Sequence, residues 1–127
     1  AAHNPHGAHA LAEAMKGYFA FTELAIVLGV LEDKDARGII DALGYLAERI
    51  HVTQSHSDRA VPVEDLAPLV LELTHQDATY QYDTPDAAIA GAREWAQEAP
   101  GRAVLVTGSI TLIGEAIELA TEQGWKR

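Results

Sequence analysis

The 127-residue chain contains no cysteine, which excludes disulfides, thiolate metal ligands and a cysteine nucleophile from it. Apolar stretches such as LAIVLGVL fall far short of the roughly 20 residues that a membrane-spanning helix needs. Basic side chains are also scarce, because 9 Lys and Arg stand against 19 Asp and Glu and give a formal net charge of −10. This balance argues against a nucleic-acid binder, which normally has a basic face. The lack of cysteine fits a reducing cytoplasm, where we expect the protein to act.

The length and the 48% hydrophobic content suit a single domain with one core, residues 1–127. The first residues, AAHNPHG, have neither the basic region nor the apolar run of a secretory signal. They also lack an initiator methionine and open directly into a motif. We therefore expect the chain to be one domain of a longer protein.

Helical and strand patterns alternate along the chain. Apolar residues at helical spacing and short branched runs predict helices over 7–20, 35–49, 63–73, 85–98 and 109–121, and strands over 24–31, 50–54, 78–82 and 103–106. Thr84 is a good N-cap for the helix that opens with Pro85. The alternation predicts an α/β fold, a Rossmann-like three-layer domain with a mostly parallel sheet flanked by helices. Because the chain opens with a loop and a helix, we expect a further strand upstream of Ala1.

In such sheets ligands bind beyond the carboxyl ends of the strands, so the loops that follow strands are the candidate site. The first loop is AHNPHGA, in which His3 and Asn4 precede a helix whose N-terminus favours anions. Either side chain could contact a phosphate or a ribose. Alternatively, Asn4 only caps the helix ahead of Pro5.

The second loop, GVLEDKD at 29–35, places a cation at the start of a helix. Helix N-termini favour carboxylates, so Asp33 and Asp35 need no special role there. Lys34 opposes the helix dipole unless an anionic partner compensates. Its alternative is a solvated lysine paired with Asp33.

The third loop contains VTGS at 106–109, where we expect Gly108 and Ser109 to form a tight turn from strand to helix. Backbone amides and the Ser109 hydroxyl there could bind a carboxylate or phosphate. The alternative is an ordinary N-cap serine.

Other catalytic patterns are absent from the sequence. His3, His6 and His9 lie close together, but a zinc site needs three converging ligands, so we expect no metal site and mostly exposed or capping histidines. The chain has no G-x-S-x-G elbow and no G-x-x-x-x-G-K-[ST] phosphate loop. It therefore cannot hold ATP by a P-loop of its own.

Taken in order, AHNPHGA, GVLEDKD, the Arg-Ala step at 59–60 and VTGS resemble the carboxy-terminal domain of folylpolyglutamate and dihydrofolate synthases, in the Mur ligase superfamily. The resemblance covers nearly the whole chain. It implies an ATP- and magnesium-dependent ligase that joins L-glutamate to folate or dihydropteroate through an acyl phosphate. By the same resemblance, the P-loop, the metal ligands and most of the folate site belong to an amino-terminal domain, which is an expected partner. No catalytic residue is expected within this chain.

The resemblance also implies roles for single residues. His3 and Asn4 match positions that reach the nucleotide, and Lys34 and Ser109 match positions that hold the carboxylates of the incoming amino acid. Arg59 is a weaker candidate for the same site, because the family often has proline before this arginine and this chain has Asp58. Two alternatives remain open: the matching domain of a UDP-muramyl peptide ligase, and a binding module without catalysis.

Overall fold

The structure, a computed structural model, describes residues 22–32, 34–74 and 78–107. The described strands are β1 (Glu23–Leu28), β2 (Arg49–Val52), β3 (Thr79–Gln81) and β4 (Arg102–Thr107). The described helices are α2 (Ala36–Leu43), the 3-10 helix η1 (Gly44–Leu46), α3 (Val63–Thr74) and α4 (Pro85–Gln97). The helices predicted over 7–20 and 109–121 lie outside the described residues.

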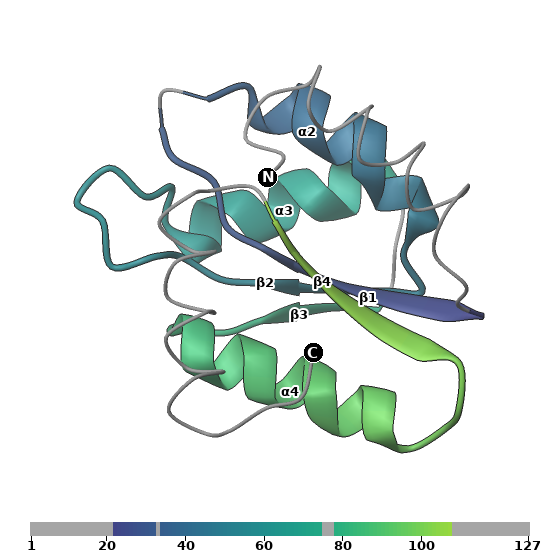
Figure 1. The fold of residues 1–127 in the computed structure, drawn as a ribbon. Helices are drawn as coiled ribbons and strands as arrows, with labels where there is room; N and C mark the ends of the chain where they lie inside the picture. Colours follow the sequence, from purple (N-terminus) through teal and green to yellow (C-terminus); the bar gives the residue numbers. More distant parts are fainter. Residues whose placement is uncertain (1–21, 33, 75–77, 108–127) are drawn as a thin grey trace.

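The described strands form one four-stranded sheet in the order β3-β2-β1-β4, and every neighbouring pair is parallel. Helices α2 and α3 cover one face and α4 covers the other (Figure 1). This arrangement confirms the predicted Rossmann-like α/β fold with helices on both sides of a parallel sheet.

Strand β1 packs against both helical layers. Leu24, Ile26 and Leu28 join the core under α2 and α3, whereas Ala25 and Val27 join the core under α4. All five side chains are at most 4% exposed. The continuous apolar run in the sequence therefore reflects a central strand whose alternate side chains are buried on opposite faces.

Two predicted boundaries are wrong. The helix expected over 35–49 ends at Leu43, continues as η1 and gives way to β2 at Arg49. Gly44 packs so tightly on α3 that a Cβ there would lie 2.6 Å from Cγ2 of Thr74. Beyond η1 the Glu48 amide donates to the Leu24 carbonyl at 2.8 Å, which draws the chain into the sheet. Helical spacing alone does not report these tertiary contacts.

The strand expected over 24–31 ends at Leu28, because the chain then leaves the sheet. Leu31 forms an isolated antiparallel bridge with Ala60 instead of pairing with β2 or β4. The other described elements begin and end within two residues of their predicted bounds.

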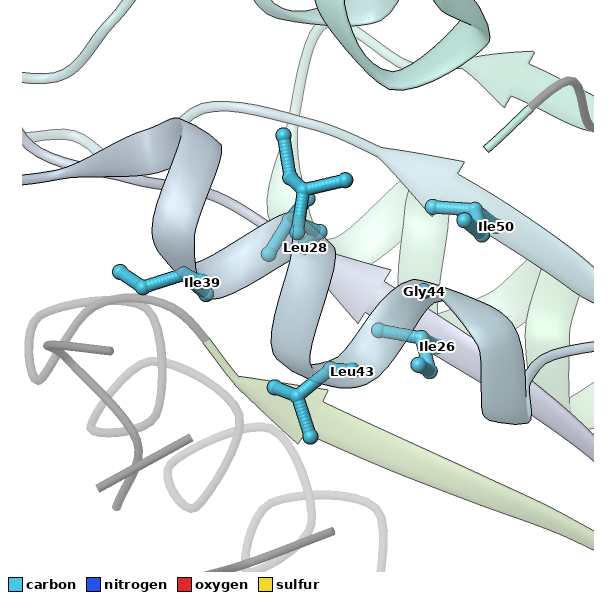
Figure 2. Close-up of a pocket in the computed structure, with 7 residues that line it drawn as sticks. Ile26, Leu28, Ile39, Leu43, Gly44 and Ile50 are labelled. Carbon is cyan, nitrogen blue, oxygen red and sulfur yellow. The ribbon is translucent and has the colours of Figure 1, made fainter. Parts of the chain in front are cut away.

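A small apolar cavity lies between α2 and the sheet (Figure 2). Its lining consists of Ile26, Leu28, Ile39, Ile40, Leu43, Gly44 and Ile50. None of these side chains offers a hydrogen bond, so the space suits neither water nor a polar substrate. It is a packing feature of the core, and the site must be sought at the sheet edge.

Candidate functional site

The order in which strands are added to the sheet changes side between β1 and β4, although the two strands are parallel. From β1 the chain proceeds outward through β2 to β3, and it then returns to the other side of β1 as β4. In open parallel sheets, the crevice at the carboxyl ends of two such strands is the usual ligand site. Leu28 and Thr107, the last residues of β1 and β4, are register partners, and the Gly29 amide donates to the Thr107 carbonyl at 3.3 Å. The segment GVLEDKD therefore meets the start of VTGS at this point.

Lys34 lies in the turn that connects β1 to α2. Its amide donates to the Leu31 carbonyl, and its carbonyl accepts from the Ala36 amide, both at 3.1 Å. The neighbouring Asp35 is the N-cap of α2, since its Oδ1 accepts from the Gly38 amide at 3.0 Å. Asp35 thus caps the helix and, as expected, needs no special role, and Lys34 is held half-buried at the helix start.

Arg59 lies on the adjoining segment, which connects β2 to α3. The Glu32 amide donates to the Arg59 carbonyl at 2.7 Å, and the Val61 amide donates to the Val30 carbonyl at 2.8 Å. These bonds flank the bridge between Leu31 and Ala60. The structure therefore brings the segments of Lys34 and Arg59 side by side, with Arg59 exposed.

Three polar side chains that sequence reasoning missed shape the Arg59 segment. Gln54 Oε1 accepts from the Val63 amide at 2.8 Å, Ser57 Oγ accepts from the Arg59 amide at 3.2 Å, and Ser55 Oγ accepts from the Ser57 amide at 3.4 Å. The available signal was the polar run TQSHSD directly after a buried strand. Hydroxyl groups two residues before a backbone amide commonly form such turns.

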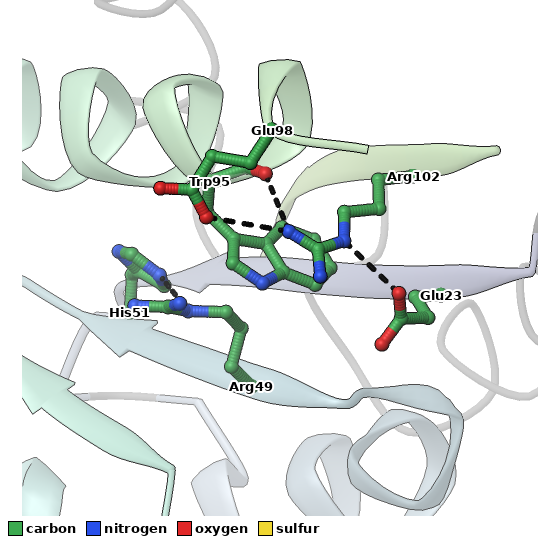
Figure 3. A network of polar contacts seen from close by, with 6 residues as sticks. All are labelled: Glu23, Arg49, His51, Trp95, Glu98 and Arg102. Carbon is green, nitrogen blue, oxygen red and sulfur yellow. Dashed lines mark hydrogen bonds and ion pairs between the residues drawn. The ribbon is translucent and has the colours of Figure 1, made fainter. Parts of the chain in front are cut away.

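Arg102 anchors a polar cluster at the opposite, amino end of β4 (Figure 3). Its Nε donates to Glu23 Oε1 and one Nη donates to the Trp95 carbonyl, both at 2.9 Å. Its guanidinium also lies 4.5 Å from the centre of the Trp95 ring. The Arg102 side chain is 18% exposed, so these contacts are partly shielded from water. The cluster joins α4 to β1 and β4.

His51, on β2, is fully buried between the sheet and α4, unlike the exposed or capping position expected of most histidines. Its Nε2 accepts from Arg49 Nε at 2.9 Å (Figure 3), and its ring stacks on Tyr82 at 5.1 Å. Burial, and then the nearby Arg49 charge, lowers the pKa of His51 from 6.5 to about 4. The imidazole is therefore neutral at pH 7 and part of the core.

Some sequence-predicted positions cannot be placed. His3, Asn4 and Ser109 lie outside the described residues. Among residues 22–32, 34–74 and 78–107, no group of three or more His, Asp or Glu side chains is arranged to hold a metal ion. No helix in this part of the chain is long and apolar enough to cross a membrane.

Comparison with solved structures gives close matches. Folylpolyglutamate synthase of Mycobacterium tuberculosis complexed with ADP superposes with a TM-score of 0.89 and 36% identity, over 94% of this chain and 28% of that one. Escherichia coli FolC in complex with DHPP and ADP gives 0.83 and 26% identity, over 97% and 28%.

Curated sequences point the same way. The dihydrofolate synthase/folylpolyglutamate synthase of M. tuberculosis is 49% identical over 67 residues, which are 53% of this chain and 14% of that protein. The corresponding protein of Bacillus subtilis is 30% identical over 114 residues, which are 90% and 25%. The chain thus spans at most about a quarter of the length of these curated relatives.

A family model described as "Mur ligase, glutamate ligase domain" matches residues 1–110. This match covers most of the chain, including the segments GVLEDKD and VTGS. The parallel sheet and its flanking helices agree with the fold of the matching structures. The chain belongs to the Mur ligase family, as a glutamate ligase domain.

Proposed function

We propose that this chain is the carboxy-terminal domain of an ATP-dependent ligase that adds L-glutamate to folate or dihydropteroate. The observation that carries the proposal is that the segment after β1, which leaves the sheet beside the end of β4, pairs with the segment that follows β2. Lys34 and Arg59 lie on these two segments, which are joined by backbone hydrogen bonds. The names of the relatives, and the ADP and DHPP bound in the solved structures, support the same substrates.

Glutamate carries two carboxylates, and both must be held while its amine remains free to react. The Lys34 ammonium and the Ser109 hydroxyl are assigned to these carboxylates, and Arg59 adds a planar guanidinium suited to paired hydrogen bonds. The folate carboxylate is phosphorylated at the P-loop domain, and the glutamate amine then displaces phosphate to form the amide. Lys34 and Arg59 position the amine for this attack and do not themselves react.

The nucleotide is assigned to a different segment. In this proposal His3 and Asn4 contact the phosphates or ribose of ATP from across the cleft. Following the family resemblance, the proposal assigns the metal ligands to the amino-terminal domain. Closure of the two domains over the acyl phosphate would exclude water from it.

The proposal is tested on the complete ligase by glutamate-dependent release of phosphate from ATP with dihydropteroate as acceptor. Lys34→Ala should raise the KM for glutamate by at least about tenfold, because a charge-assisted bond to a carboxylate is lost, and leave the KM for ATP within about twofold. Arg37→Ala is the matched control, since Arg37 is an exposed cation paired with Glu72.

Two results would contradict the proposal. One is activity with UDP-muramyl substrates and none with dihydropteroate, which would assign the chain to a peptidoglycan ligase. The other is full activity of the Lys34→Ala, Ser109→Ala double variant, which would show that glutamate does not bind at these two residues.

A further inference from the structure

We propose that Gln54 is a positioning residue for the glutamate site. This inference rests on the proposed function and extends it to a residue that touches no substrate. The Gln54 side chain bonds the 53–62 segment to the start of α3. In doing so it holds Arg59 in place and preserves the pairing of this segment with the Lys34 segment.

The start of α3 needs a cap from elsewhere. The first amides of a helix have no partner within the helix, and a Ser, Thr, Asp or Asn side chain at the preceding residue usually accepts from them. That residue is Pro62, which has no side-chain acceptor. The Val63 amide instead donates to Gln54 Oε1 at 2.8 Å, across nine residues of chain. The cap of α3 is therefore also the bond that closes the segment carrying Arg59.

Arg59 sits within the closed segment. At its near end, Gln54 follows Thr53, whose amide donates to the Leu28 carbonyl of β1 at 2.9 Å. At its far end, the Val61 amide donates to the Val30 carbonyl. Between them, Ser57 Oγ accepts from the Arg59 amide at 3.2 Å. The Arg59 backbone is thus fixed from both sides, and the Gln54 bond holds the two ends together.

The same closure reaches Lys34 through the backbone. The Arg59 carbonyl accepts from the Glu32 amide at 2.7 Å, and Ala60 pairs with Leu31. Leu31 in turn accepts from the Lys34 amide at 3.1 Å. Opening the 53–62 segment removes one side of this pairing, so both cations assigned to glutamate lose their fixed separation. Freeing the segment restores conformational entropy that must be lost again when glutamate binds.

The test uses the complete ligase with Gln54→Leu, which removes the acceptor and keeps the bulk. We expect the KM for glutamate to rise about tenfold, with the KM for ATP and the kcat within about threefold. Gln54→Glu keeps an oxygen acceptor at a helix N-terminus and should stay within about threefold of wild type. Gln97→Leu makes the same chemical change on an exposed residue at the far end of α4 and should change neither constant.

A double-variant comparison separates positioning from a merely structural role. In an Arg59→Ala background, Gln54→Leu should add less than about threefold to the KM for glutamate, because the spacing of Arg59 from Lys34 that Gln54 fixes no longer matters once the Arg59 guanidinium is gone. A full tenfold effect in that background would overturn the proposal. An unchanged KM for glutamate in Gln54→Leu, with only the kcat or the amount of folded enzyme reduced, would also overturn it. Wild-type ligase without glutamate-dependent activity would instead refute the proposed function.

Discussion

At the scale of single residues, His51 shows how burial changes a titratable group. The ring is fully buried, accepts one hydrogen bond from Arg49, and leaves Nδ1 without a hydrogen-bond partner. Protonation would place a second positive charge beside Arg49 inside the α4 layer. The folded chain therefore favours the neutral ring.

This preference predicts a pH dependence of stability. The pKa of His51 is about 4 in the folded chain, and in the unfolded chain it takes its ordinary value of 6.5. Between pH 6.5 and pH 4, therefore, the imidazole is protonated only in the unfolded chain. Stability from His51 is complete above pH 6.5, falls as the pH is lowered toward 4, and changes no further below that. Urea unfolding should show a loss of roughly 1–2 kcal/mol from this group between pH 7.5 and pH 5. His51→Phe, which keeps a ring for Tyr82, should lack that part of the slope, and equal slopes in the two proteins would disprove it.

Arg102 and Arg37 test whether burial decides the value of an ion pair. Arg102 is 18% exposed and also contacts a carbonyl and the Trp95 ring, whereas the Arg37 and Glu72 side chains are 58% and 63% exposed. Arg102→Ala should reduce the free energy of unfolding by about 1–3 kcal/mol, because Glu23 and the Trp95 carbonyl lose their donor. Arg37→Ala should cost less than about 0.5 kcal/mol. Chemical denaturation of the two variants gives the comparison, and equal losses would contradict it.

At the scale of helices and strands, the sequence predicted those elements whose signals are local. Thr84 was expected to cap α4 ahead of Pro85, and its hydroxyl accepts from the Ala87 amide at 3.4 Å. The apolar run of β1 predicted a central strand, because a strand whose alternate side chains enter two cores is apolar at every position. Both elements are specified by their own residues.

The end of α2 and the pairing of the two loops could not be predicted in this way. Leu43 is followed by more apolar residues at helical spacing, yet the α-helix gives way at Gly44 to η1, where Gly44 packs against Thr74 of α3. Likewise, Lys34 and Arg59 were each recognised as candidates, yet their adjacency depends on the bridge of Leu31 with Ala60, 29 residues apart in the numbering. Such contacts depend on how α2 and α3 pack against each other, and the spacing of apolar residues along the sequence carries no information about that packing.

The contact of Gly44 with α3 gives an element-scale prediction. Its φ is −59°, so alanine would suit the backbone, but a Cβ would lie 2.6 Å from Thr74 Cγ2. Gly44→Ala should therefore destabilise the chain by about 1–3 kcal/mol through overpacking, in place of the usual gain from replacing glycine. Thermal or urea unfolding measures the loss.

A second variant identifies the cause of that loss. Thr74→Ser removes Cγ2 and keeps the hydroxyl that donates to the Val70 carbonyl at 2.7 Å. In the Thr74→Ser background, Gly44→Ala should cost less than about 0.5 kcal/mol. An undiminished cost would show that the space beside Thr74 is not what requires glycine.

At the scale of the whole molecule, net charge and ligand charge have the same sign. The chain carries a formal charge of −10, and its proposed ligands, glutamate and ATP, are anions. Binding must then rest on local cations and helix starts, because the overall field repels these ligands. In the proposed function each ligand also meets only this chain's share of the cleft, and the chain spans 28% of the M. tuberculosis and E. coli structures.

The 127-residue chain alone should therefore bind glutamate weakly, with a Kd above about 1 mM, which corresponds to less than about 4 kcal/mol of binding energy. In the complete ligase, loaded with ATP and dihydropteroate, the same segments close on a preorganised partner, and the apparent Kd should fall at least about tenfold. Isothermal titration of both proteins measures the difference. Addition of Lys34→Ala to the complete ligase should abolish most of this gain, because the proposed function assigns Lys34 to a carboxylate of glutamate. If the chain alone bound glutamate as tightly as the loaded ligase, the segments of Lys34 and Arg59 would form a complete site on their own, and the cleft between two domains would be unnecessary for recognition.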